Sequence, residues 1–85
     1  MRRVTRTEIE QQLIAIVRQE KPLPDDALKP DTELAAAGID SLDALTILFA
    51  IEEHFRISIP DAAARAMKTF GDMVDIVAKE VGSES

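Results

Sequence analysis

Hydrophobic residues recur at helical spacing in separate stretches of the chain, and this pattern predicts amphipathic helices. The first stripe lies within residues 6–20 and consists of Ile9, Leu13, Ile16 and Val17. The second, within residues 41–55, is expected on Leu45, Leu48, Ile51 and Phe55, with Leu42 and Phe49 near its edges. The last, towards the C-terminus, contains Phe70, Met73, Val74, Val77 and Val81. We expect these stripes to face one another across a single core.

Each predicted long helix follows a polar residue suited to cap its N-terminus. The capping side chains and the acid three residues later are Thr5 with Glu8, Asp40 with Asp43, and Thr69 with Asp72. In a capping box the first side chain accepts a backbone N–H bond and the acid reaches back to the cap's N–H. Val4 and Ile9 also stand at the positions of a hydrophobic staple around the first cap.

Prolines and short apolar runs predict how the helices are joined. Pro22, Pro24 and Pro30 exclude a long helix between residues 21 and 31, and the apolar anchors of this connection are expected to be Leu23, Leu28 and Leu34. Residues 57–60 alternate like a strand but have no partner segment, and Asp61 is expected to cap a short helix ending near Met67. The sequence therefore predicts an all-α four-helix bundle, three helices longer and one short, in one domain of 85 residues. Its ordered core would span about residues 4–81, with residues 82–85 frayed.

Composition narrows the classes of function. The chain has no cysteine, which excludes disulfides and Cys-based zinc sites. No apolar run is close to the length of about 20 residues that a helix needs to span a membrane. The N-terminus lacks the apolar segment of a signal peptide, so a cytoplasmic location is expected. We also expect a monomer. Residues 22–55 carry eight acids and one base, a net charge of −7, whereas the remainder carries +1. This acidic segment disfavours nucleic acid and favours basic protein patches.

Ser41 is the residue that draws attention, because it follows a glycine and an Asp cap at the start of a helix. A nucleophilic serine needs a general base, and the one histidine, His54, lies 13 residues further along the same predicted helix. At 1.5 Å per residue this is roughly 20 Å, so we expect no enzyme activity of the chain's own. The acidic pairs lack the spacing of a calcium loop, and no metal site is expected.

The residues around Ser41 belong to a wider pattern that resembles the acyl carrier protein family. The matching stretches are Gly38-Ile39-Asp40-Ser41-Leu42-Asp43, Ala50-Ile51-Glu52-Glu53-His54-Phe55, Ile57-Ser58-Ile59-Pro60-Asp61 and Thr69-Phe70-Gly71-Asp72-Met73-Val74. The resemblance implies a 4′-phosphopantetheine arm on Ser41, transferred from coenzyme A by a phosphopantetheinyl transferase. Acyl groups would be held as thioesters on the arm, whose thiol supplies the sulfur that this cysteine-free chain lacks.

The resemblance also assigns roles to residues near Ser41. Partner docking would involve Asp40, Leu42, Asp43, Thr46, Phe49, Glu52 and Glu53. An acyl-chain pocket would be lined by Leu45, Leu48, Ile51, Phe55 and Ile59. The partners implied, besides the transferase, are acyl ligases, ketosynthases or acyltransferases with basic docking patches.

The chain departs from carriers of primary fatty acid synthesis. These usually have an acid where Thr46 stands and further acids where residues 61–67 read DAAARAM. We therefore expect a free-standing carrier of a specialised lipid or secondary-metabolite pathway. A carrier of primary fatty acid synthesis is the alternative, as is, from another class, a structural adaptor that has the fold and no arm.

Overall fold

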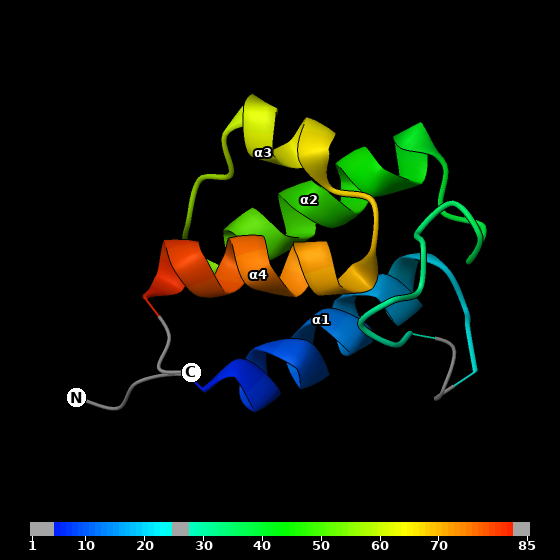
Figure 1. Ribbon diagram of the computed structural model, residues 1–85, viewed down its shortest axis with the longest axis horizontal. Coiled ribbons are helices and arrows are strands. Elements are labelled where there is room, and N and C mark those ends of the chain that lie inside the picture. The colour runs from blue at the N-terminus through cyan, green and yellow to red at the C-terminus, as the bar shows by residue number, and fades with distance from the viewer. Residues whose placement is uncertain (1–4, 25–27, 83–85) are drawn as a thin grey trace.

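The computed structural model of the protein describes residues 5–24 and 28–82 (Figure 1). Within these ranges the chain forms helices α1 (Arg6–Glu20), α2 (Ser41–Phe55), α3 (Asp61–Ala66) and α4 (Phe70–Val81). The described residues form no strand, and an isolated bridge pairs Glu33 with Thr69, so the predicted all-α fold with one short helix is confirmed. Val4 of the predicted staple and residues 83–85 of the predicted frayed end lie outside the described ranges.

The predicted caps begin their helices as expected, although the reciprocal capping box forms at Thr69 and not at Thr5, whose hydroxyl instead donates to the Glu8 carboxylate at 3.3 Å. The Thr5 hydroxyl accepts a bond from the Glu8 N–H at 3.2 Å, and Thr69 forms a reciprocal capping box with Asp72. Asp40 accepts from the Asp43 N–H at 2.8 Å, as predicted. The second half of that box is wrong, because the carboxylate of Asp43 contacts a lysine of another element instead.

The core lies where α1 packs against α2 and α4, and α3 lies at the opposite edge of the bundle from α1 (Figure 1). The stripes predicted for α1 and α4 are buried, except that Val81 is only partly so. The buried apolar side chains of the described residues are Ile9, Leu13, Ile16, Val17, Leu28, Leu34, Ile39, Ile47, Ile51, Ile59, Phe70, Met73, Val74 and Val77.

The register predicted for α2 is partly wrong. Its fully buried residues are Ile47 and Ile51, one helical turn apart, whereas Leu45 is 52% exposed. Leu48 and Phe55 are partly buried against the core. Nine of the fifteen residues of α2 are Leu, Ile, Phe or Ala, so the sequence pattern allows more than one apolar face. Contact with α1 selects the face that contains Ile47.

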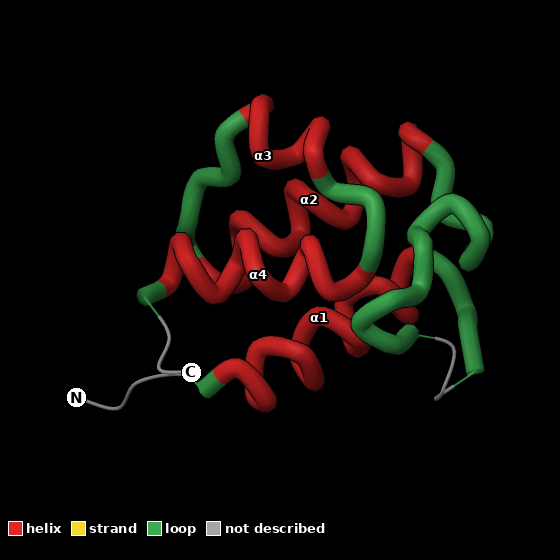
Figure 2. Tube along the Cα trace, in the orientation of Figure 1, coloured by secondary structure: helices red, strands yellow, loops and turns green. Residues whose placement is uncertain are grey.

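The connection from α1 to α2 folds over one end of the bundle, beside the start of α4 (Figure 2). As predicted, Leu28 and Leu34 anchor it in the core, and Leu23 packs partly against them. Backbone bonds also attach it to the α3–α4 junction: Leu34 N–H to Lys68 O (2.9 Å), Phe70 N–H to Thr32 O (2.9 Å) and Gly71 N–H to Pro30 O (2.8 Å). These bonds hold residues 30–34 in a defined position next to α3.

The α2–α3 connection differs in detail from the prediction. Arg56 ends α2 in the left-handed region, with φ 57° and ψ 51°. The Glu52 carboxylate accepts a bond from the Ile59 N–H at 2.8 Å, which fastens the loop to α2. Asp61 is the first residue of α3 rather than its cap, because Pro60 occupies the cap position, and the helix ends at Ala66. Proline is favourable there since it has no N–H to leave unpaired.

Candidate functional site

The site begins with the turn that leads into α2. Gly38 has φ +87°, a conformation that glycine adopts without strain, and it reverses the chain after residues 34–37. Ile39 is then buried in the core, which fixes the path of the backbone. Asp40 caps α2 with its carboxylate. Ser41 is consequently presented at the first position of a well-anchored helix with its side chain exposed to solvent.

The N-terminus of α2 retains unpaired backbone donors beside Ser41. Asp40 accepts bonds from the N–H groups of Asp43 and Ala44, through its side chain at 2.8 Å and its carbonyl at 2.9 Å. Within the described residues, the N–H groups of Ser41 and Leu42 have no hydrogen bond. These donors and the positive end of the helix dipole favour a phosphate on the Ser41 oxygen.

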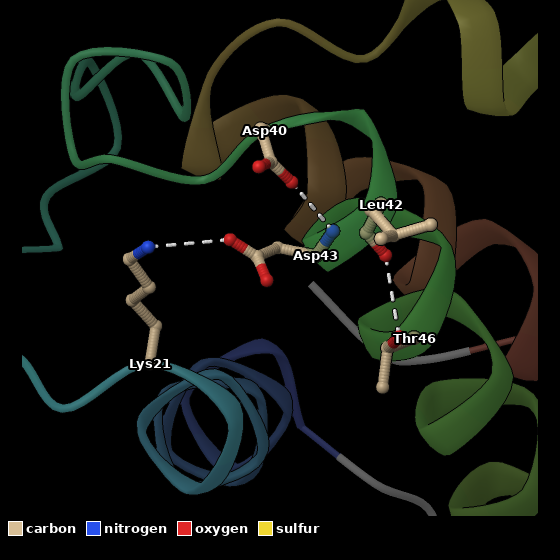
Figure 3. Close-up of polar contacts among 5 residues, drawn as sticks. All are labelled: Lys21, Asp40, Leu42, Asp43 and Thr46. Carbon is tan, nitrogen blue, oxygen red and sulfur yellow. Dashed lines mark hydrogen bonds and ion pairs between the residues drawn. The ribbon is translucent and has the colours of Figure 1, made fainter.

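A lysine from the end of α1 supports the same turn (Figure 3). The Lys21 ammonium lies 3.3 Å from the Asp43 carboxylate, and both side chains are partly shielded from water. The Cε atom of Lys21 also lies 3.4 Å from the point where a side chain on Gly38 would begin. Lys21 therefore connects α1 to the start of α2. A separate bond lies within α2, where the Thr46 hydroxyl donates to the Leu42 carbonyl at 3.2 Å (Figure 3).

A cleft of about 460 Å³ opens beside Ser41, between the first turns of α2, the 33–40 segment and α3. Most of its walls are apolar, with Leu34 and Ile39 among the residues that line it. The cleft has the size of a small-molecule site, for which roughly 300–1,000 Å³ is usual. Ser41 at its rim, the free N–H groups and this apolar space fit a phosphate-linked arm with an acyl chain.

The residues predicted for an acyl pocket are distributed over two environments. Leu45 and Leu48 line the cleft. Ile51 and Ile59 belong to the buried core, and Phe55 is partly buried against it at the far end of α2. These three side chains are not among the residues that line the cleft. The additional apolar walls come from Leu34, Ile39, Ala44, Ala64 and Met67, which lie on other turns and elements.

The predicted docking residues also separate into two groups. The first group is exposed to solvent and comprises Asp40, Leu42, Thr46, Phe49 and Glu53. In this group Leu42 is 74% and Phe49 66% exposed, which is unusual for large apolar side chains. The second group is Asp43 and Glu52, whose carboxylates are engaged inside the molecule with Lys21 and the Ile59 N–H.

His54 lies at the opposite end of α2 from Ser41, as the sequence predicts. It is exposed, and its Nε2 lies 2.8 Å from Gln12 Oε1. Its ring also meets Phe55 edge-on, with 4.9 Å between ring centroids. Since α2 is a single continuous helix, His54 cannot act as a base for Ser41.

One carboxyl group of the described residues has a shifted pKa. Backbone N–H bonds from Lys68 and then Thr69 lower the pKa of Asp72 below its usual 3.8. Hydrogen bonds to the charged form have this effect because they stabilise the carboxylate. Asp72 thereby helps to hold the α3–α4 junction that forms one side of the cleft.

Sequence reasoning missed the contacts between distant residues that shape this site. Lys21 and Asp43 are 22 positions apart, and no local pattern pairs them. The bond from Ile59 to Glu52 and the left-handed Arg56 were likewise not predicted. A glycine is the usual signal for a left-handed helix end, and here that signal is missing because the residue is an arginine.

Comparison with known proteins agrees with the fold and shows the family. Residues 11–77 match the family described as the phosphopantetheine attachment site. The protein is 34% identical to the acyl carrier protein of Prochlorococcus marinus over 80 residues, which cover 93% of this chain and all of that one. It is 33% identical to acyl carrier protein 1, chloroplastic, of Casuarina glauca over 76 residues, which are 88% of this chain and 56% of that protein.

The chain thus spans about half the length of the chloroplastic relatives it matches. A crystal structure of an acyl carrier protein from Thermotoga maritima has the same fold, with a TM-score of 0.80, 19% identity and 91% of each chain covered. The described residues contain no helix able to cross a membrane.

Fold and matched family together define a phosphopantetheine-bearing protein. The chain belongs to the acyl carrier protein family, and its prosthetic group is 4′-phosphopantetheine. When bound, this group supplies the thiol that holds an acyl chain as a thioester.

Proposed function

We propose that Ser41 is the residue to which the phosphopantetheine arm is attached. The supporting observation is that an exposed Ser41 hydroxyl stands at the capped N-terminus of α2, next to two free N–H groups and on the rim of an apolar cleft. In the transfer, a phosphodiester bond to Ser41 Oγ forms as the pyrophosphate bond of coenzyme A breaks, and 3′,5′-adenosine diphosphate and the serine proton are released. Asp40 and Lys21 hold the turn so that the hydroxyl remains accessible to the transferase.

The mass of the intact protein tests this proposal directly. The protein is incubated with coenzyme A, Mg²⁺ and a promiscuous phosphopantetheinyl transferase, and we expect a gain of one phosphopantetheine. Ser41→Ala should abolish the gain. Ser58→Ala is the matched control, because Ser58 is also exposed but lies in the α2–α3 loop. No gain in the wild-type protein, or a gain that persists in Ser41→Ala, would contradict the proposal.

The function that follows is delivery of acyl thioesters to partner enzymes, without catalysis by the chain itself. Partners would dock on the exposed face of α2, where Leu42 and Phe49 provide apolar contacts and Asp40 and Glu53 provide charge. The exposed Leu45 joins this face although the sequence predicted it to be interior. We expect acyl ligases, ketosynthases or acyltransferases with an apolar centre and basic rim, and the cytoplasm remains the predicted location.

A specialised pathway is favoured over primary fatty acid synthesis by the charge around α3. This helix and its C-cap contain one acid, Asp61, and one base, Arg65, among alanines and Met67. A partner whose basic patch extends from α2 to α3 would therefore gain little attraction here. An arm-less structural adaptor is the competing class of function, and the mass experiment separates it from a carrier.

A comparison of rates tests the pathway. The phosphopantetheine-loaded protein and a carrier from primary fatty acid synthesis are each supplied to the malonyl transferase of that pathway. We expect the present protein to be slower by at least about tenfold in transfer efficiency, which is 1.4 kcal/mol of lost transition-state stabilisation. Equal rates would favour the primary pathway instead.

A further inference from the structure

The cleft beside Ser41 contains two cations in an otherwise mainly apolar wall. Arg65 is in the last turn of α3, and Lys68 follows that helix by two residues. The acids that line the cleft are Glu33 and Asp40, and Asp40 already accepts the bonds that cap α2. The cleft is therefore a place where an apolar chain and an anionic group could be held together.

The backbone holds both cations at the edge of the cleft. The Lys68 N–H donates to the Asp72 carboxylate at 3.0 Å, and the Lys68 carbonyl accepts from the Leu34 N–H at 2.9 Å. Leu34 itself is buried and lines the same cleft. The position of Lys68 is thus coupled to the cleft wall. Arg65 precedes it by three residues and belongs to the same short segment.

The positive charge of Lys68 acts on the Asp72 carboxylate and helps to lower the pKa of that group, but the two side chains do not form a close ion pair. Among residues 5–24 and 28–82, neither Arg65 nor Lys68 forms an ion pair. By contrast, Lys21, the cation on the other side of Ser41, is paired with Asp43 at 3.3 Å. Arg65 also has a local reason for its position, since a cation in the last turn of a helix suits the dipole. That preference does not account for a second cation, Lys68, on the same cleft.

We infer that Arg65 and Lys68 form an anion subsite of the cleft. This inference rests on the proposed attachment at Ser41 and adds a class of cargo to it. The ligand of this subsite is a group with anionic oxygen atoms, which both side chains can bind through charge-assisted hydrogen bonds. Its source is either a carboxylate at the free end of the acyl chain, as in a dicarboxylic acyl thioester, or the phosphodiester of the arm.

The experiment compares cargoes that match in length and differ in charge. The transferase loads the protein from coenzyme A, pentanoyl-coenzyme A or glutaryl-coenzyme A, and the mass of each product establishes loading. Two signals are then measured: the side-chain NMR shifts of Arg65 and Lys68, and the rate at which hydroxylamine cleaves each thioester. The variants are Arg65→Gln, Lys68→Gln and the double substitution. Lys79→Gln is the matched control, because this exposed cation in the last turn of α4 is not part of the cleft.

The two sources predict different results. If the anion is the cargo carboxylate, the glutaryl thioester is cleaved about twofold to fivefold more slowly relative to pentanoyl, the range expected for an exposed ion pair. The double substitution removes this difference and Lys79→Gln retains it. If the anion is the arm phosphodiester, both side-chain signals shift when coenzyme A alone is the donor, and glutaryl adds nothing. A loaded protein in which neither signal responds to arm or cargo overturns the inference. Failure of loading itself, seen by mass, would instead contradict the attachment at Ser41.

Discussion

Glu52 is a residue for which sequence and structure make different predictions. The acidic face of α2 suggested that its carboxylate docks a partner, whereas the structure shows it half-buried and accepting the Ile59 N–H at 2.8 Å. A hydrogen bond to a charged group contributes about 1.5–3 kcal/mol, and partial exposure favours the lower end. Since alanine also has a slightly better helix propensity, we expect Glu52→Ala to lower the free energy of unfolding by about 1–1.5 kcal/mol.

That loss corresponds to a decrease in Tm of roughly 4–12 °C for a domain of this size. Thermal and urea unfolding followed by far-UV circular dichroism would measure it. Glu52→Gln retains an acceptor but removes the charge, so it should lose less than about 1 kcal/mol. Glu53→Ala is the control, because Glu53 is the adjacent acid and is exposed. It should leave Tm within about 2 °C of the wild type.

The rate of arm transfer distinguishes the two roles of Glu52. If its carboxylate is structural, Glu52→Gln should be modified at the wild-type rate under conditions where it is folded. A Glu52→Ala variant that unfolds at the wild-type temperature would refute the structural role. A Glu52→Gln variant that folds normally and is modified many times more slowly would restore the docking role that the sequence predicted.

Further predictions concern the backbone around the cleft. Gly71→Ala should destabilise the protein by about 1–3 kcal/mol through overpacking, because the new Cβ atom would lie 2.6 Å from the Pro30 carbonyl oxygen. Chemical denaturation measures the change. Unchanged stability would show that residues 30–34 can move away from the new atom. Arg56→Gly should stabilise by about 0.5–1 kcal/mol, because Arg56 has φ 57°, and a lower Tm would mean that its side chain makes a compensating contact. Asp72→Asn should lower the free energy of unfolding at neutral pH and should make that free energy depend less on pH in the acidic range. Because folding lowers the pKa of Asp72, its carboxylate stabilises the protein at pH values above the unfolded pKa of about 4, and this stability is lost as the pH falls through the pKa of the folded state. Urea unfolding at a series of pH values from neutral to acidic measures the effect. If the free energy of unfolding changed with pH in the same way for variant and wild type, the reasoning would be contradicted.

Much of the fold was predictable because local rules decide it. The starts of α1 and α2 follow from Thr5 and Asp40, because each of these side chains accepts a bond from one free N–H group of the helix that it precedes. The buried face of α1 was predicted because its stripe has a single register. In α2 the apolar residues surround much of the helix, so the sequence could not separate Ile47, which is buried, from Leu45, which is exposed.

The sequence by itself determined the helices, the acidic segment and the position of Ser41 at a helix start, since all of these depend on residues close together in the chain. Only the tertiary structure decided which acids are available to partners and that a cleft opens beside Ser41. Asp43 is paired with Lys21 and Glu52 with the Ile59 N–H. Arg65 and Lys68 reach the same cleft as Ser41 because the α3–α4 junction is bonded to residues 30–34. Such contacts join residues far apart in the chain, and their geometry exists only once the helices have packed.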